Sequence, residues 1–180
     1  VKTASAEQDL TVNAQRIGGG NLQSLDDPVK ASNPCFFSDC GEFQDVTSSL
    51  HSLWTAQNLS QDSPPLRVLI SDLEVNGRDI SSVIKAIRPH TKAGAVIGIL
   101  ALKLPFNGKV FDSSGSVIFE GEAQRPIYIL ASGPQVQVKP LLQSIKQMMP
   151  VTTSVKMTFL EEWVNRRTIT VKSLAGIPSS

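Results

Sequence analysis

From Asp45 onward the chain alternates between amphipathic segments and short continuous apolar runs. Three of these runs stand out, at residues 66–71 (LRVLIS), 95–102 (AVIGILAL) and 125–133 (RPIYILASG). Runs of this length between Pro, Gly and charged residues are typical of strands that are covered on both faces of a sheet. The pattern therefore predicts three core strands, and we expect Leu69, Ile97 and Ile129 to be buried on adjacent, mutually parallel strands.

Apolar residues at helical spacing predict three amphipathic helices that pack on this sheet. Asp45 and Asp79 are suited to cap the first two helices, and Pro140 sets the first turn of the third. Pro89 and Pro150 are expected to end the second and third helices, since proline cannot continue the backbone hydrogen bonding. The inward stripes are Val46, Leu50, Leu53 and Trp54; Ile80, Val83, Ile84 and Ile87; and Leu141, Leu142, Ile145, Met148 and Met149.

Turn signals at Asn107-Gly108 and Ser114-Gly115 surround alternating apolar residues, which predicts a β-hairpin over residues 109–120. The element order favours an α/β fold: a doubly wound, mainly parallel, Rossmann-like sheet with helices on both faces and an appended β-hairpin. Residues 1–34 are rich in Ser, Asn, Gln, Gly and Asp and are interpreted as a flexible N-terminal arm or linker. The α/β domain then covers 35–150, and 151–180 forms further strands or a tail.

Composition and charge narrow the expected partners. The 180 residues carry 17 Lys plus Arg and 16 Asp plus Glu, so no net excess attracts nucleic acid or an anionic membrane. The longest apolar run has half the length of a membrane-spanning helix. We therefore expect a protein partner, no nucleic acid and no membrane span. Cys35 and Cys40 could form a local disulfide, but unbonded thiols are the favoured state, and the compartment stays open.

Polar residues follow the first predicted strand directly. Asp72 and Glu74 would lie at the carboxyl edge of a parallel sheet, where such folds bind ligands. Thr47, at the start of the preceding helix, could converge on them, and these oxygens suit Mg²⁺, Ca²⁺ or Mn²⁺. A turn-capping role explains Asp72 equally well. His51 and His90 lack an accompanying nucleophile motif, so both are expected at the surface and no catalytic residue is predicted.

Several of these segments resemble the von Willebrand factor A-like domains. "QDVTSSLHSLW", with Thr47, resembles the threonine loop of the family, and "RVLISD", with Asp72, resembles its strand and metal-binding aspartate. The resemblance covers Asp45 to about Met149. It implies a doubly wound α/β domain whose metal ion binds a carboxylate of a partner. The family's Asp-x-Ser-x-Ser motif is missing, so either the first strand lies upstream of Val1 or the site is degenerate.

These observations predict a protein–protein interaction module, in which a divalent cation held by Thr47, Asp72 and Glu74 can complete the contact. Two alternatives stay open. One is a metal-dependent hydrolase in which Asp72 and Glu74 hold the ion that activates water. The other is a structural subunit without a site. Hydrolytic metal centres usually recruit histidine or several carboxylates, so the small number of candidate ligands favours binding over hydrolysis.

Overall fold

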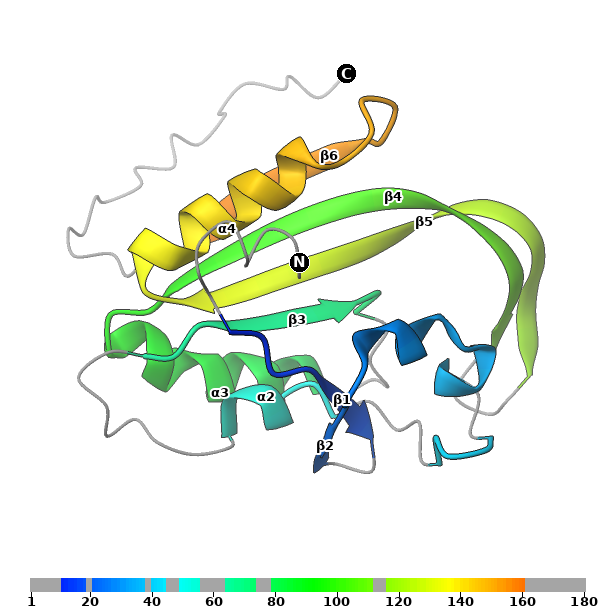
Figure 1. The fold of residues 1–180 in the computed structure, drawn as a ribbon, viewed down its shortest axis with the longest axis horizontal. Coiled ribbons are helices and arrows are strands. Elements are labelled where there is room, and N and C mark those ends of the chain that lie inside the picture. Colours follow the sequence, from blue (N-terminus) through cyan, green and yellow to red (C-terminus); the bar gives the residue numbers. More distant parts are fainter. Residues whose placement is uncertain are drawn as a thin grey trace, which may run out of the picture.

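A four-stranded antiparallel sheet forms the centre of the molecule (Figure 1). The structure is a computed structural model, and it describes residues 11–18, 21–37, 40–44, 49–55, 64–73, 79–111 and 116–160. Across the sheet the strands follow the order β3-β5-β4-β6. Their bounds are Arg67–Ser71 for β3, Val96–Phe111 for β4, Val117–Gly133 for β5 and Val155–Leu160 for β6.

The predicted doubly wound, mainly parallel sheet is wrong, and so is the Rossmann-like assignment. Strand β5 lies between β3 and β4 and is antiparallel to both, with Leu69 opposite Leu130 and Leu100 opposite Ile129. Strands β3 and β4 therefore run in the same direction without being neighbours. The three apolar runs do form strands, in which Leu69, Ile97 and Ile129 are buried, but β3 is an edge strand and only Leu69 of it is buried. The hairpin that joins the second and third runs places β5 antiparallel between the two strands that were expected to be parallel neighbours.

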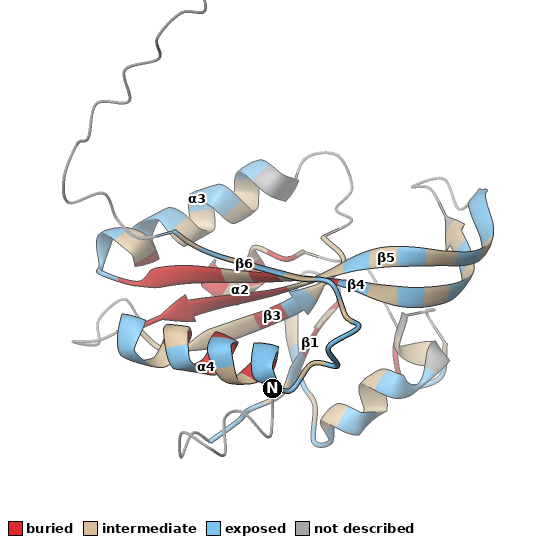
Figure 2. Cartoon of the chain, turned by 90° about the horizontal axis from the view of Figure 1, so that it is seen from above, coloured by how far each residue is buried: buried red, intermediate tan, exposed pale blue. Residues whose placement is uncertain are grey.

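Helices pack on the two faces of this sheet (Figure 2). On one face, α4 (Gln135–Gln147) buries Val138, Leu141, Leu142 and Ile145 against β4 and β5. On the other face, α2 (Ser52–Thr55) and α3 (Asp79–Lys92) form a second core, which includes Trp54, Leu69 and Leu130. In the described part of the chain, no helix is long and apolar enough to span a bilayer.

The helix ends differ from those predicted from proline positions. Helix α3 continues through Pro89 to Lys92, and α4 starts at Gln135, so that Pro140 lies inside it. Both prolines are exposed, and water can therefore solvate the carbonyl that loses its intrahelical N–H partner. The inward stripe of the second helix was also partly wrong, because Ile84 is 61% exposed.

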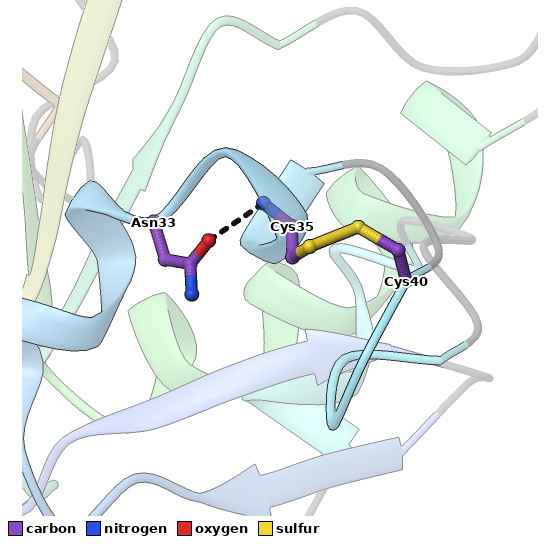
Figure 3. Close-up of a disulfide and its surroundings, with 3 residues drawn as sticks. All are labelled: Asn33, Cys35 and Cys40. Carbon is purple, nitrogen blue, oxygen red and sulfur yellow. Dashed lines mark hydrogen bonds between the residues drawn. A yellow bond between two sulfur atoms is a disulfide. The ribbon is translucent and has the colours of Figure 1, made fainter.

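The segment interpreted as a flexible arm contains regular structure. Strands β1 (Gln15–Gly18) and β2 (Asn21–Ser24) form an antiparallel hairpin, and two 3₁₀ helices, η1 (Pro28–Ser32) and η2 (Pro34–Phe37), follow. Cys35 and Cys40 form a disulfide, which corrects the expectation of unbonded thiols. Asn33 Oδ1 accepts a hydrogen bond of 3.0 Å from the Cys35 N–H, as Figure 3 shows, and this bond shapes the turn into the disulfide loop.

A buried arginine joins the β1–β2 hairpin to this disulfide loop. Arg16 is 4% exposed, and its guanidinium carbon lies 5.6 Å from the ring centroid of Phe36 and 5.7 Å from that of Phe43. Its Nη1 donates to Gln23 Oε1 and to the Gln44 carbonyl, each at 3.0 Å. Because a buried guanidinium requires hydrogen-bond acceptors, these contacts fix the position of the loop relative to the hairpin.

Candidate functional site

The predicted oxygen-ligand site lies largely outside the part of the chain that the structure describes, so it stays a prediction. Thr47 and Glu74 lie outside the described residues. Asp72 is half-buried directly after β3, where Ser71 Oγ accepts a hydrogen bond from the Leu73 N–H and Leu73 has a positive φ of 58°. This is turn geometry. Among the described residues no group of three His, Cys, Asp or Glu side chains could hold a metal ion.

A buried polar chain links helices α2 and α3 to the sheet. The Trp54 indole N–H donates to Ser132 Oγ at 2.9 Å, and His90 Nε2 lies 2.8 Å from the Trp54 carbonyl oxygen. Because a carbonyl only accepts, Nε2 of the neutral ring carries the proton, and Nδ1 is left as acceptor for the Arg67 guanidinium, 3.4 Å away. Burial lowers the pKa of Arg67. His90 is 5% exposed, so its predicted surface position is wrong.

This buried row of hydrogen bonds has the geometry of a structural contact and not of a nucleophile–base pair. Trp54 separates Ser132 from His90, so the serine and the histidine do not form a nucleophile–base pair. We expect Trp54→Phe to lower the free energy of unfolding by about 1–2 kcal/mol, because the buried Ser132 hydroxyl loses its donor. Urea unfolding followed by circular dichroism measures this. The double variant Trp54→Phe/Ser132→Ala should recover part of the loss, and strictly additive losses would contradict the coupling.

The feature that distinguishes the surface is a long hairpin arm. Strand β3 pairs with β5 only from residue 128 onward, and β6 pairs with β4 only as far as residue 102. Residues 103–111 and 117–127 therefore extend beyond both neighbouring strands as a two-stranded ribbon, which we call the arm (Figure 1). The antiparallel pairing predicted for 109–120 is its outer end, but the turn predicted at Asn107-Gly108 is wrong, because both residues lie inside β4. The arm is not an appendage to a parallel sheet, since the same two strands form the centre of the sheet.

The two faces of the arm differ sharply in chemistry, because side chains alternate between the faces of a sheet. On the side of α4, the core positions Leu100 and Ile129 continue into an apolar face: Leu104, Phe106, Val110, Phe119, Ala123 and Ile127, interrupted by Arg125. On the side of α3 lies a polar face: Lys103, Pro105, Asn107, Lys109, Glu120, Glu122, Gln124 and Pro126. On this polar face Lys109 Nζ lies 3.2 Å from Glu120 Oε1.

The core helix covers only the base of the apolar face. The cluster around α4 includes Leu104 but, among the described residues, no position further along the arm. At the outer end of this face Val117 and Phe119 are 48% and 38% exposed. Ile70 of β3, on the same face of the sheet, is 57% exposed. Apolar side chains that are exposed on one face of a ribbon are typical of an interaction site.

A glycine pair shapes the middle of the arm. Gly108 lies opposite Gly121, which has a φ of 132°, a conformation that favours glycine. The Phe106 ring lies over Gly108, where a Cβ would be only 3.1 Å from its Cζ, and the Arg125 guanidinium carbon lies 5.2 Å from the Phe106 ring centroid. The missing side chains therefore leave room for an aromatic ring on the apolar face and permit the bend of the hairpin.

Comparisons with known proteins identify no relative: no family model, no curated protein and no solved structure matches the chain. The resemblance to von Willebrand A-like domains receives no support from them, and the antiparallel sheet contradicts the fold that it implied. The arm was missed as a candidate site, although its alternation could have been read from the sequence. Every second position of 103–109 and 120–124 is Lys, Asn, Glu or Gln, except for Pro105, and this pattern indicates one solvated face.

Proposed function

We propose that this chain is a protein-binding module that engages another protein through the arm. The observation that carries the proposal is the apolar face that continues past α4 to the outer end of the arm, where Val117 and Phe119 are exposed. An isolated two-stranded ribbon is only marginally stable in water and needs a further strand or a packed face. A partner that covers this face would bury its apolar side chains, as α4 buries those at the base of the hairpin.

Surface depressions give no comparable support for small-molecule chemistry. Two depressions open to solvent are lined by residues 12–15 with 24–26 and by seven residues between Lys146 and Val155. Neither places a nucleophile beside a base or gathers carboxylates for a metal. The arm, in contrast, offers aromatic and aliphatic side chains on one face, and buried aromatic residues carry much of the binding energy at protein interfaces.

The experiment uses a photo-crosslinking amino acid at Phe119 of the full chain, with the same label at Ile84 of α3 as the matched control. Both positions are exposed and apolar, but only Phe119 lies on the arm. The protein crosslinked through Phe119 is then produced and titrated directly. We expect Phe106→Ser and Phe119→Ser to weaken its binding at least tenfold, and Ile84→Ser to change it less than threefold. Equal effects at Phe119 and Ile84 would refute a role for the arm.

A further inference from the structure

We infer that the partner adds an extended strand to the outer edge of β5 in the arm, and that this strand alternates apolar residues with Lys or Arg. The inference rests on the proposed function and names the chemistry of the partner. It follows from three features: the direction of the backbone groups, the positions of two prolines, and the charges on the polar face.

The backbone direction can be traced from one hydrogen bond. The Lys103 N–H donates to the Ser154 carbonyl at 3.1 Å, so it points away from β5. In an antiparallel pair, residues that face each other are either both hydrogen-bonded to each other or both turned outward, and the two kinds alternate. Because Lys103 lies opposite Pro126, the outward positions of β5 in the arm are Pro126, Gln124, Glu122 and Glu120. Tyr128, the next of these alternate positions, also faces outward, because it pairs with Ser71 of β3.

Two prolines limit where neighbouring strands can pair. Pro126 is the next outward position of β5 after Tyr128, and it has no N–H to offer to β3. This explains why β3 ends at Ser71 and turns away at Leu73. Pro105 has the equivalent place on the outward edge of β4, next to Lys103, whose N–H is already bonded. Prolines at these positions protect the base of the arm against further pairing.

The remaining open edge is longer on β5 than on β4. Beyond Pro105, strand β4 keeps Asn107 and Lys109 as outward positions before the register shift after Val110. Strand β5 keeps three in succession, Gln124, Glu122 and Glu120, each with an N–H and a carbonyl directed outward. In the described part of the chain no strand pairs with them. Three successive positions of this kind form a ladder that an added strand can use.

The side chains at these positions define the chemistry of the added strand. Glu120 and Glu122 lie on the polar face, and both are exposed. Residues directly opposite in an antiparallel pair have their side chains on the same face, and opposite charges there are favourable. Lys or Arg therefore suits the positions that face the two glutamates. The intervening residues would lie on the apolar face beside Phe119 and Ala123, where aliphatic or aromatic side chains can extend the apolar surface.

A second copy of this chain fits the edge less well. Two copies could pair antiparallel through their β5 edges, with a two-fold axis between Glu120 and Glu122. Glu120 of each copy would then lie opposite Glu122 of the other copy. Like charges that face each other across a strand pair are destabilising. The charge of the edge thus favours a basic segment of another protein over self-association.

The test titrates full-length protein with labelled nine-residue peptides by fluorescence anisotropy. The probe alternates valine and lysine, beginning and ending with valine. We expect it to bind, and a valine–glutamate peptide to bind at least tenfold more weakly. Methylation of the backbone nitrogens of the lysines, which face β5, should weaken binding at least tenfold, whereas methylation of the valine nitrogens should change it less than threefold. No binding of the probe, or equal binding of both methylated peptides, would overturn strand addition.

Two variants identify the edge and separate this inference from the proposed function. Glu122→Pro removes an outward N–H of β5 without removing a backbone hydrogen bond of the hairpin, and should weaken peptide binding at least tenfold. Asn107→Pro does the same at the opposite residue on the β4 edge, and should change it less than threefold. The 3.4 Å side-chain bond from Asn107 Nδ2 to Glu122 Oε1 is lost equally in both variants. If Phe119→Ser weakens the crosslinked partner but Glu122→Pro affects neither partner nor peptide, strand addition is refuted and the proposed function stands. A dimer in sedimentation that Glu122→Pro converts to monomer would also refute it, in favour of a second copy.

Discussion

Replacing Leu142 by alanine should lower the free energy of unfolding by about 3 kcal/mol. Leu142 is fully buried in α4, and its Cδ1 lies over the backbone of Gly98 in β4. Truncation removes buried methyl groups and leaves a cavity that a packed sheet cannot fill by relaxing. Denaturant unfolding monitored by circular dichroism measures the loss.

Two control variants test whether the effect comes from packing. Leu142→Met keeps the volume and should cost less than about 1.5 kcal/mol. Val136→Ala lies on the same helix at a position that is 80% exposed, and should change stability by less than about 0.5 kcal/mol. A Leu142→Ala loss as small as that of Val136→Ala would show that α4 is not packed on β4 in this way.

The contact with Gly98 adds a coupled expectation. A Cβ at Gly98 would collide with Leu142 Cδ1 and lie 3.0 Å from Val138 Cγ1 and Phe159 Cε1. Gly98→Ala should therefore destabilise the wild type by about 1–3 kcal/mol, through overpacking. In the Leu142→Ala background the same methyl group enters the cavity, and its cost should shrink. Additive effects of the two substitutions would contradict this contact.

Gly133→Ala should destabilise the protein by about 3 kcal/mol or more, for reasons of backbone geometry. Gly133 ends β5 with a φ of 154°, and a Cβ there would lie 2.8 Å from Leu66 Cα and 3.2 Å from the Pro65 carbonyl oxygen. These are backbone atoms of the segment that enters β3, so they cannot move aside as a side chain could. The substitution therefore adds a steric collision to conformational strain.

Gly94→Ala is the matched control for that variant. Gly94 also has a positive φ, of 87°, but a Cβ there would meet no atom of the described residues within 4 Å. Its substitution should cost about 1 kcal/mol, from backbone strain alone. The difference between the two variants in thermal or urea unfolding isolates the collision with residues 65–66. Equal losses would refute the close approach of the two segments at Gly133.

Local sequence patterns predict only part of the candidate site. The alternation of polar and apolar residues in 103–109 and 120–124 predicts two different faces, and both exist. It does not show that α4 covers only the base of the apolar face, because helix length and crossing point depend on packing between distant segments. Asp72 was predicted to be a metal ligand because the carboxyl edge of a parallel sheet is where such folds bind ligands. In the antiparallel sheet it follows an edge strand that stops where β5 presents Pro126.

Local sequence determined three strands of the central sheet and the inward face of α4, but not the β1–β2 hairpin. Continuous apolar runs became β3 and the inner halves of β4 and β5, and Leu141, Leu142 and Ile145 face inward from α4 as their spacing predicts. Proline positions did not predict the helix ends. Pro89 and Pro140 lie inside helices, on exposed faces where water replaces the lost hydrogen bond.

Strand order and the state of the cysteines were decided only in three dimensions. Alternating strands and helices are compatible with parallel neighbours, and equally with two strands of the same direction separated by a third. The protein has the second arrangement because β4 and β5 are adjacent in sequence, and pairing them closes only a short loop. Helix α3, which connects β3 to β4, then crosses over β5. The Cys35–Cys40 spacing permits a disulfide, but bonding depends on the bend that Asn33 and η2 impose, which the spacing alone does not contain.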